Sequence, residues 1–225
     1  MTSVRQSGIG SHMERNHIID AYYGDRLTAE DVTRGTGLSE RSQRELLRLG
    51  ILKPVPQAPT KQRLLSRPMF KRAAVIARLN SCGLSLSTAG QIAFFAPGSD
   101  ALIDNDSFAE GIVLHNETDN DWLATIRIIN NECVELDTGQ PDPIEYCLLS
   151  ENMTKLTRLL WRNAATGNYA DARPTNNMLI QFDERDVIEA DAASFKAARQ
   201  NPVTTINVDI TRSITVALRR LLSID

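Results

Sequence analysis

Helix start and stop signals lie unusually close together near residue 30, and they constrain the fold of this chain more than any other feature. Thr28 is followed three residues later by Asp31, the spacing of a capping box in which Asp replaces the usual Glu or Gln. A helix is therefore expected to begin at Thr28. Gly35 and Gly37 bracket its end, because glycine readily adopts the left-handed geometry of a tight turn.

A second helix is expected almost at once. Ser39 is a favourable N-cap residue, the helix that follows it runs to Leu49, and Gly50 stops it. Only a few residues separate the two short helices, which is the layout of a helix-turn-helix. The stretch His17–Tyr23 before them is compatible with either a short helix or a strand.

The next segment predicts a small β-wing followed by two helices. Ile51-Leu52 and residues 63–65 are short apolar runs around a proline-rich loop, and proline does not occur in paired central strands. Ser66 then predicts the start of a helix that runs to about Cys82. Ser85 predicts the start of another, with one apolar face made of Leu86, Ala89, Ile92 and Ala93.

Charge divides the chain into two unlike halves. Residues 1–99 carry 14 Lys and Arg against 7 Asp and Glu, a balance of +7, whereas residues 100–225 carry 11 against 21, a balance of −10. Residues 41–78 hold ten basic residues and one acidic residue, Glu45. This asymmetry favours two domains with different partners and makes the basic half the candidate for nucleic-acid binding. A merely solvated basic surface is the alternative.

The predicted fold class is α+β in two domains, the first a mostly helical winged helix-turn-helix and the second a mixed α+β domain. We expect a disordered segment over residues 1–16, the first domain over 17–96 and the acidic domain over 100–225. The breaker cluster Ala96-Pro97-Gly98-Ser99 marks the boundary. Beyond it the sequence predicts strands over 111–115, 124–136, 144–149, 177–182 and 204–210, and helices over 152–165, 191–199 and 211–222.

Five short motifs of the basic half occur in a particular order: Thr36-Gly37-Leu38-Ser39, Arg44, Gly50-Ile51-Leu52-Lys53-Pro54, Arg63 and Gly83-Leu84-Ser85-Leu86. Because these motifs occur in this order, segment 28–92 resembles the DNA-binding domain of the MerR family of bacterial regulators. The resemblance implies a winged helix-turn-helix in which Arg44 contacts phosphate. Glu45-Leu46 replaces the aromatic pair of the family, and Gln43 stands where the family carries a buried aliphatic residue. The resemblance stops near Pro97, where the long coiled-coil helix of the family has no counterpart.

The residues of the second helix indicate DNA binding independently of the resemblance. Arg41, Arg44 and Arg48 lie at positions i, i+3 and i+7 and therefore form one stripe, while Leu46 and Leu49 lie on the other side. Such a helix packs on the domain with its apolar face and enters the major groove with its basic face.

Other residues of the basic half complete the predicted DNA site. Ser42 and Gln43 are expected to reach base edges. The cations expected to contact backbone phosphates are Lys61 and Arg63 on the wing and Arg67, Lys71 and Arg72 on the next helix. Glu45 either pairs with Arg41 or Arg48 or reads a cytosine.

The remaining chemistry-bearing residues suggest no catalytic site. Cys82, Cys133 and Cys147 have no metal-binding spacing and are expected to be free thiols, the last two in strands. Trp122 and Trp161 are expected in the core. The polar loop after His115 lacks the pattern of a catalytic or metal cluster, and no membrane span is expected.

These patterns predict a sequence-specific, double-stranded DNA-binding transcription regulator of bacterial type. We expect it to be cytoplasmic and nucleoid-associated, homodimeric through its C-terminal domain, and without enzymatic activity, cofactor or metal. Whether the second domain responds to a small-molecule or protein effector stays open. The alternatives are an excisionase-like or architectural DNA-binding protein, a protein-interaction module with a degenerate helix-turn-helix, and a C-terminal enzyme or ligand-binding domain.

Overall fold

The structure is a computed structural model, and it is mostly helical with small antiparallel sheets. The residues it describes are 9–56, 63–95, 103–104, 107–115, 117, 124–129, 133–137, 145–149, 158–162, 169–171 and 203–224. The expected boundary at 96–99, the strand over 177–182 and the helix over 191–199 lie outside these residues.

Five helices occupy the basic half of the chain: α1 (Ile9–Tyr23), α2 (Ala29–Thr36), α3 (Glu40–Arg48), α4 (Arg67–Ser81) and α5 (Leu86–Phe95). The helices expected after Thr28, Ser39, Ser66 and Ser85 are all confirmed. The stretch His17–Tyr23 before them, whose sequence is compatible with either helix or strand, is helical. This helix begins at Ile9, so residues 9–16 differ from the disordered segment expected there.

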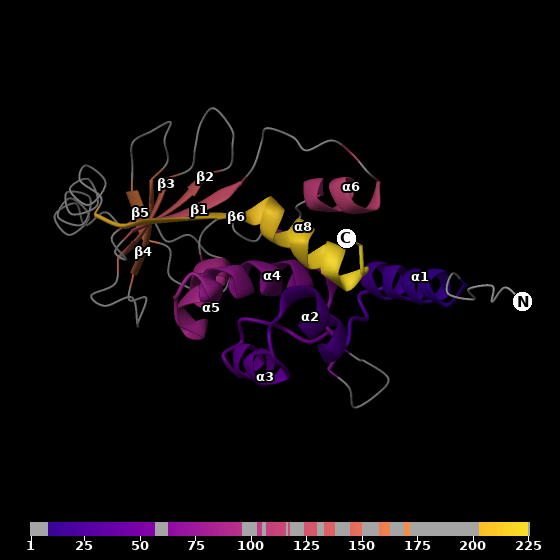
Figure 1. The fold of residues 1–225 in the computed structure, drawn as a ribbon. Coiled ribbons are helices and arrows are strands. Elements are labelled where there is room, and N and C mark those ends of the chain that lie inside the picture. The colour runs from indigo at the N-terminus through magenta and orange to yellow at the C-terminus, as the bar shows by residue number, and fades with distance from the viewer. Residues whose placement is uncertain are drawn as a thin grey trace, which may run out of the picture.

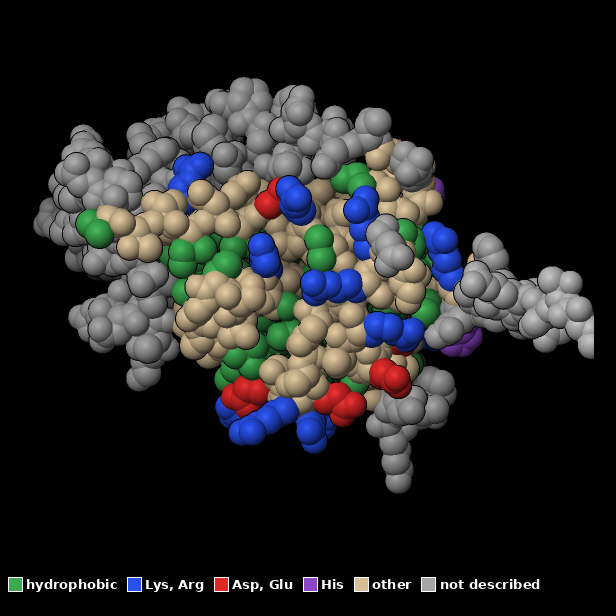
Figure 2. All heavy atoms as spheres, in the orientation of Figure 1, with side chains coloured by type: hydrophobic (Ala, Val, Ile, Leu, Met, Phe, Trp, Pro, Cys, Tyr) green, Lys and Arg blue, Asp and Glu red, His purple; other side chains and the backbone are tan. Residues whose placement is uncertain are grey.

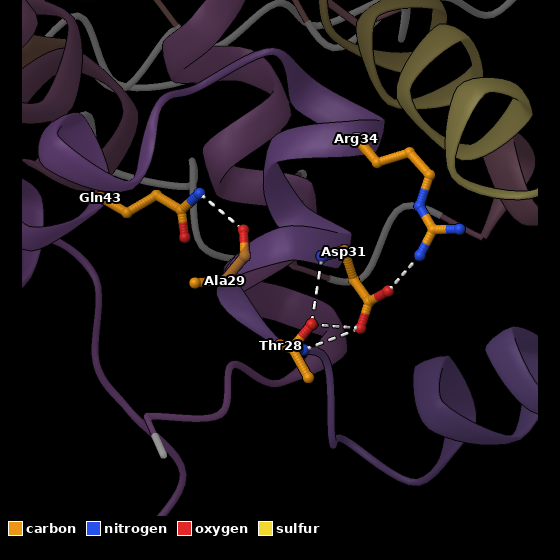
Figure 3. Close-up of polar contacts among 5 residues, drawn as sticks. All are labelled: Thr28, Ala29, Asp31, Arg34 and Gln43. Atoms are coloured by element: carbon orange, nitrogen blue, oxygen red, sulfur yellow. Dashed lines mark hydrogen bonds and ion pairs between the residues drawn. The ribbon is translucent and has the colours of Figure 1, made fainter.

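Local capping fixes the bounds of α2 and α3. The Thr28 hydroxyl accepts a hydrogen bond from the Asp31 backbone N–H, while the Asp31 carboxylate accepts one from the Thr28 backbone N–H (Figure 3). This is the expected capping box. Gly37 ends α2 with φ of +79°, and Ser39 caps α3. The turn between the two helices is short because left-handed glycine reverses the chain within a few residues.

The segment between α3 and α4 forms the base of the expected wing. Val55 N–H donates to the Leu64 carbonyl at 2.9 Å, and Pro54 and Leu65 form an antiparallel bridge. Leu65 also bridges Leu27, which ties this pairing to the start of α2. Ile51 and Leu52 are buried but are not part of a strand, so the pairing begins at Pro54 and not at Ile51.

The acidic half contributes α6 (Phe108–Leu114), β1 (Thr125–Ile129), β2 (Cys133–Asp137), β3 (Glu145–Leu149), β4 (Arg158–Arg162), β5 (Tyr169–Asp171), β6 (Thr205–Asp209) and α8 (Ile210–Leu221). The strands form two antiparallel sheets with the orders β2-β1-β6 and β3-β4-β5. In the first sheet Ile128 lies opposite Val134 on one side and Ile206 on the other. The expected strands near 144–149 and 204–210 and the expected helix over 211–222 are thus found. The stretch expected as one strand over 124–136 is instead two strands, β1 and β2, which pair with each other. Cys133 and Cys147 lie in strands, as expected.

Two further expectations for the acidic half are wrong. Residues 111–115, expected as a strand for their β-branched and apolar content, belong to helix α6, which packs against α8. The expected helix over 152–165 contains strand β4, which pairs with β3 on one side and β5 on the other. In both cases long-range packing outweighs local propensity, which is a weak determinant of short elements.

The C-terminal helix is part of the same hydrophobic core as the N-terminal helices. Ile214 and Leu218 of α8 are buried, and α8 packs against α2, α4 and α6 (Figure 1). The contact is close: a Cβ atom on Gly35 of α2 would lie 2.7 Å from the Phe70 ring and 3.0 Å from the Ala217 carbonyl oxygen. The last residues of the chain therefore brace the helix that precedes α3.

Candidate nucleic-acid interface

Helix α3 has one buried face and one arginine face. Leu46 is fully buried, whereas Arg41, Arg44 and Arg48 are exposed. In Figure 2, Lys and Arg side chains gather at the edge of the molecule where α3 lies in Figure 1. The stripe expected from the i, i+3, i+7 spacing is therefore present on the surface.

Two open hollows flank this stripe. One, of about 500 Å³, is lined by Arg44, Leu47, Arg48, Pro54 and Arg63. The other, of about 410 Å³, is lined by Arg41, Ser42, Arg44, Glu45, Arg48 and Leu86. The structure thus brings Arg63, at the base of the expected wing, next to the arginines of α3. Lys61 lies outside the described residues.

Glu45 pairs with Arg48 and not with Arg41. Its two carboxylate oxygens accept hydrogen bonds of 3.0 and 2.7 Å from the Arg48 Nε and Nη2 atoms. The hydrogen bond from Arg48 lowers the pKa of the Glu45 carboxyl, and both side chains are largely exposed. Arg44 donates weakly to the Glu40 carbonyl at 3.4 Å. Among the described residues, Arg41 forms no ion pair, so Arg41 and Arg44 carry the least engaged charges on α3.

Gln43 does not reach the surface, which corrects the expectation that it reads base edges. Its residue exposure is 2%, and its Nε2 atom donates to the Ala29 carbonyl at 3.0 Å (Figure 3). The same atom lies 3.0 Å from the Leu38 carbonyl and 2.9 Å from the Thr33 hydroxyl. These acceptors belong to α2 and to the turn, so the side chain fastens α3 to both. The signal was in the sequence, because Gln43 occupies the position where the MerR pattern carries a buried residue.

We expect Gln43→Ala to lower the free energy of unfolding by about 1–3 kcal/mol, because it removes a buried donor from the three acceptors that it joins. Chemical denaturation of the full chain measures this change. Arg41→Ala on the same helix is the matched control and should change stability by no more than about 0.5 kcal/mol. Equal stability of the two variants would contradict the fastening role of Gln43.

Lys71 and Arg72 are also withdrawn from the surface, which corrects their expected role at phosphates. Both residues are 2% exposed. Lys71 Nζ lies 2.6 Å from Glu110 Oε1, and Arg72 Nη2 lies 2.7 Å from Asp104 Oδ2. These carboxylates come from the start of the acidic half, and no sequence pattern placed them against α4. Each of the two cations is therefore paired with a carboxylate inside the protein.

Arg67 occupies an intermediate position. Its guanidinium lies 3.7 Å from Glu110 and 5.6 Å from the centre of the Tyr23 ring, and 39% of its side chain is exposed. Glu110 also accepts a 2.9 Å hydrogen bond from the Tyr22 hydroxyl. Burial, and secondarily the Glu110 charge, raises the pKa of Tyr22 far above its ordinary value, so this hydroxyl stays a donor. Glu110 is therefore the centre of a buried polar cluster with Tyr22, Arg67 and Lys71.

Comparisons of this chain with protein-family models and with curated proteins give no match. Within the described part of the chain, no group of three or more His, Cys, Asp or Glu side chains is placed to hold a metal ion. None of the described helices is long and apolar enough to cross a membrane.

Proposed function

We propose that this chain is a transcription regulator of bacterial type that binds double-stranded DNA through a winged helix-turn-helix. The observation that carries the proposal is the arrangement of α3. The side of α3 that carries Gln43 and Leu46 is buried, and its exposed arginines line two hollows, one of which Arg63 also lines. The resemblance of segment 28–92 to the MerR pattern supports the same function.

The exposed helix α3 fits a DNA duplex in particular. A single exposed helix matches the width of the major groove, and arginine contacts both guanine edges and phosphates through its planar guanidinium. The segment that carries Arg63 would then follow the adjacent backbone, as wings do. Phosphate contacts fix orientation, while side chains that enter the groove select sequence. Arg41 and Ser42 are the residues we assign to the groove, with Arg44, Arg48, Arg63 and Arg67 at phosphates.

We further propose that the chain acts in the bacterial cytoplasm as a homodimer. One α3 helix offers a small contact area, and two copies that bind neighbouring half-sites double it. The acidic residues 100–225 would mediate dimerisation or respond to an effector. A two-fold symmetric target sequence is the expected consequence.

Selection of bound duplexes from a random-sequence library tests the proposal. The full chain should enrich a defined motif with two half-sites, and Arg44→Glu should abolish the enrichment because charge reversal repels phosphate. Failure to enrich any sequence, together with an unchanged cellular phenotype of Arg44→Glu, would instead favour a protein-interaction module. Enriched motifs that map to attachment sites and not to promoters would favour an excisionase-like role.

Glu45→Gln is expected to tighten duplex binding about tenfold, because it removes a negative charge from the arginine face and releases Arg48 for phosphate contact. The slope of log affinity against log salt should steepen by about one unit. Fluorescence anisotropy at several salt concentrations measures both quantities. Glu117→Gln, an exposed acid near α6, is the control and should change neither. Weaker binding with a relaxed base preference would mean that Glu45 reads a base.

A further inference from the structure

A second basic site lies away from α3, in a groove between α4, α8, β6 and the end of α2. The groove encloses about 520 Å³. Arg78 of α4 and Arg212 and Arg220 of α8 line it, and all three are exposed. Figure 2 shows Lys and Arg side chains gathered over the face where α8 and α4 lie in Figure 1. None of these arginines forms an ion pair with another described residue.

The position of Arg212 is unfavourable for the helix that carries it. It lies in the first turn of α8, where the helix dipole favours acidic residues, yet this turn contains none. The acidic residue that lines the groove, Asp209, is the N-cap of α8 and accepts a 2.7 Å hydrogen bond from the Arg212 backbone N–H. The groove thus combines three guanidinium groups with a positive helix end, and one carboxylate already engaged in capping.

We propose that this groove binds a small anionic ligand that carries a phosphate or pyrophosphate group. Its volume lies within the range of small-molecule sites, roughly 300–1,000 Å³. Arginine recognises phosphate through paired N–H donors, and Asn207 and Ser81 on the rim offer further polar contacts. Ala77 and Val216 provide an apolar wall for the body of such a ligand.

The groove is connected to α3 through the end of α2. Gly35 and Thr36 form part of its wall. The Thr36 hydroxyl donates to the Val32 carbonyl at 2.7 Å and accepts from the Leu38 backbone N–H at 3.1 Å, within the turn before α3. A ligand that contacts Thr36 therefore acts on the element that orients α3. This coupling rests on the proposed function, whereas ligand binding itself does not.

Isothermal titration of the full chain with inorganic pyrophosphate, without DNA, tests the site. We expect one equivalent of pyrophosphate to bind. The double variant Arg212→Gln/Arg220→Gln is expected to weaken this binding by at least about tenfold, since each charge-assisted contact contributes on that scale. Arg78→Gln, on a different helix, provides a second variant if the double variant does not fold. Arg219→Gln neighbours the groove without lining it, and Arg44→Gln removes a cation from α3. Both controls should retain the wild-type affinity within about twofold.

Two results would overturn the proposal. One is the absence of pyrophosphate binding to the wild-type chain at low salt. The other is binding that Arg44→Gln abolishes and the groove variants preserve, because the anion would then occupy the α3 face. In the first case, a separate measurement in which the groove variants weaken duplex binding would identify the groove as a DNA-backbone contact. The titration contains no DNA, so its outcome is independent of the proposed function.

Discussion

Glu110→Gln is expected to lower the free energy of unfolding by about 3–5 kcal/mol, the cost of removing the charge of one member of a buried ion pair. The side chain of Lys71 is 3% exposed and that of Glu110 is 13% exposed, so water does not compensate the Lys71 charge. The same substitution weakens the acceptor of the Tyr22 hydroxyl and removes the carboxylate near Arg67. Denaturant unfolding of the full chain, followed by circular dichroism, measures the loss.

Two further variants make this result specific to the ion pair. Asp20→Asn removes an exposed carboxylate from α1 and should change stability by no more than about 0.5 kcal/mol. Lys71→Met in the Glu110→Gln background should recover part of the loss, because it removes the uncompensated buried charge. A loss below about 1 kcal/mol for Glu110→Gln, or no recovery in the double variant, would show that the cluster does not hold α6 on α4.

The second large effect concerns DNA. Replacing Arg41 and Arg44 together with alanine is expected to weaken duplex binding about 100-fold, because each arginine contact to a base or phosphate contributes about 1–3 kcal/mol. These two side chains are exposed and are the least engaged cations of α3. The double variant should fold normally, since alanine favours helix and neither side chain packs in the core.

Anisotropy titration of a labelled duplex measures this loss, with Arg219→Ala as the matched control. Arg219 is an exposed arginine on α8, which packs against α2, α4 and α6. Its replacement should leave affinity within about twofold of wild type, as expected for a charge distant from the DNA. Equal losses in the double variant and the control would mean that binding reflects overall charge and not the α3 stripe.

Local signals allowed four of the five helices of the basic half, α2 to α5, to be predicted from sequence. The capping box at Thr28, the caps at Ser39 and Ser66 and the stop at Gly50 depend only on neighbouring residues, and the structure places helix ends at each of them. The arginine stripe was predictable for the same reason, since helical periodicity alone decides which side chains share a face.

Long-range contacts could not be predicted in this way. Lys71 and Arg72 belong to a basic run, and only the fold shows that Glu110 and Asp104 reach them from the acidic half. The packing of α8 against Gly35 likewise joins residues from opposite ends of the chain. Strand β4 was mistaken for helix because its pairing partners, and not its own residues, determine its conformation. Charge segregation along a sequence therefore does not reveal which charges face solvent.

The dependence of duplex affinity on salt tests the central claim most directly, because phosphate contacts release counterions. Four cations of α3 and the adjacent segments, Arg44, Arg48, Arg63 and Arg67, are the ones assigned to backbone phosphates. We predict that log affinity falls linearly with log salt concentration, with a slope of about −3 to −4 per bound chain. A slope near zero, or no duplex binding at low salt, would contradict the assignment of α3 as a DNA-binding helix.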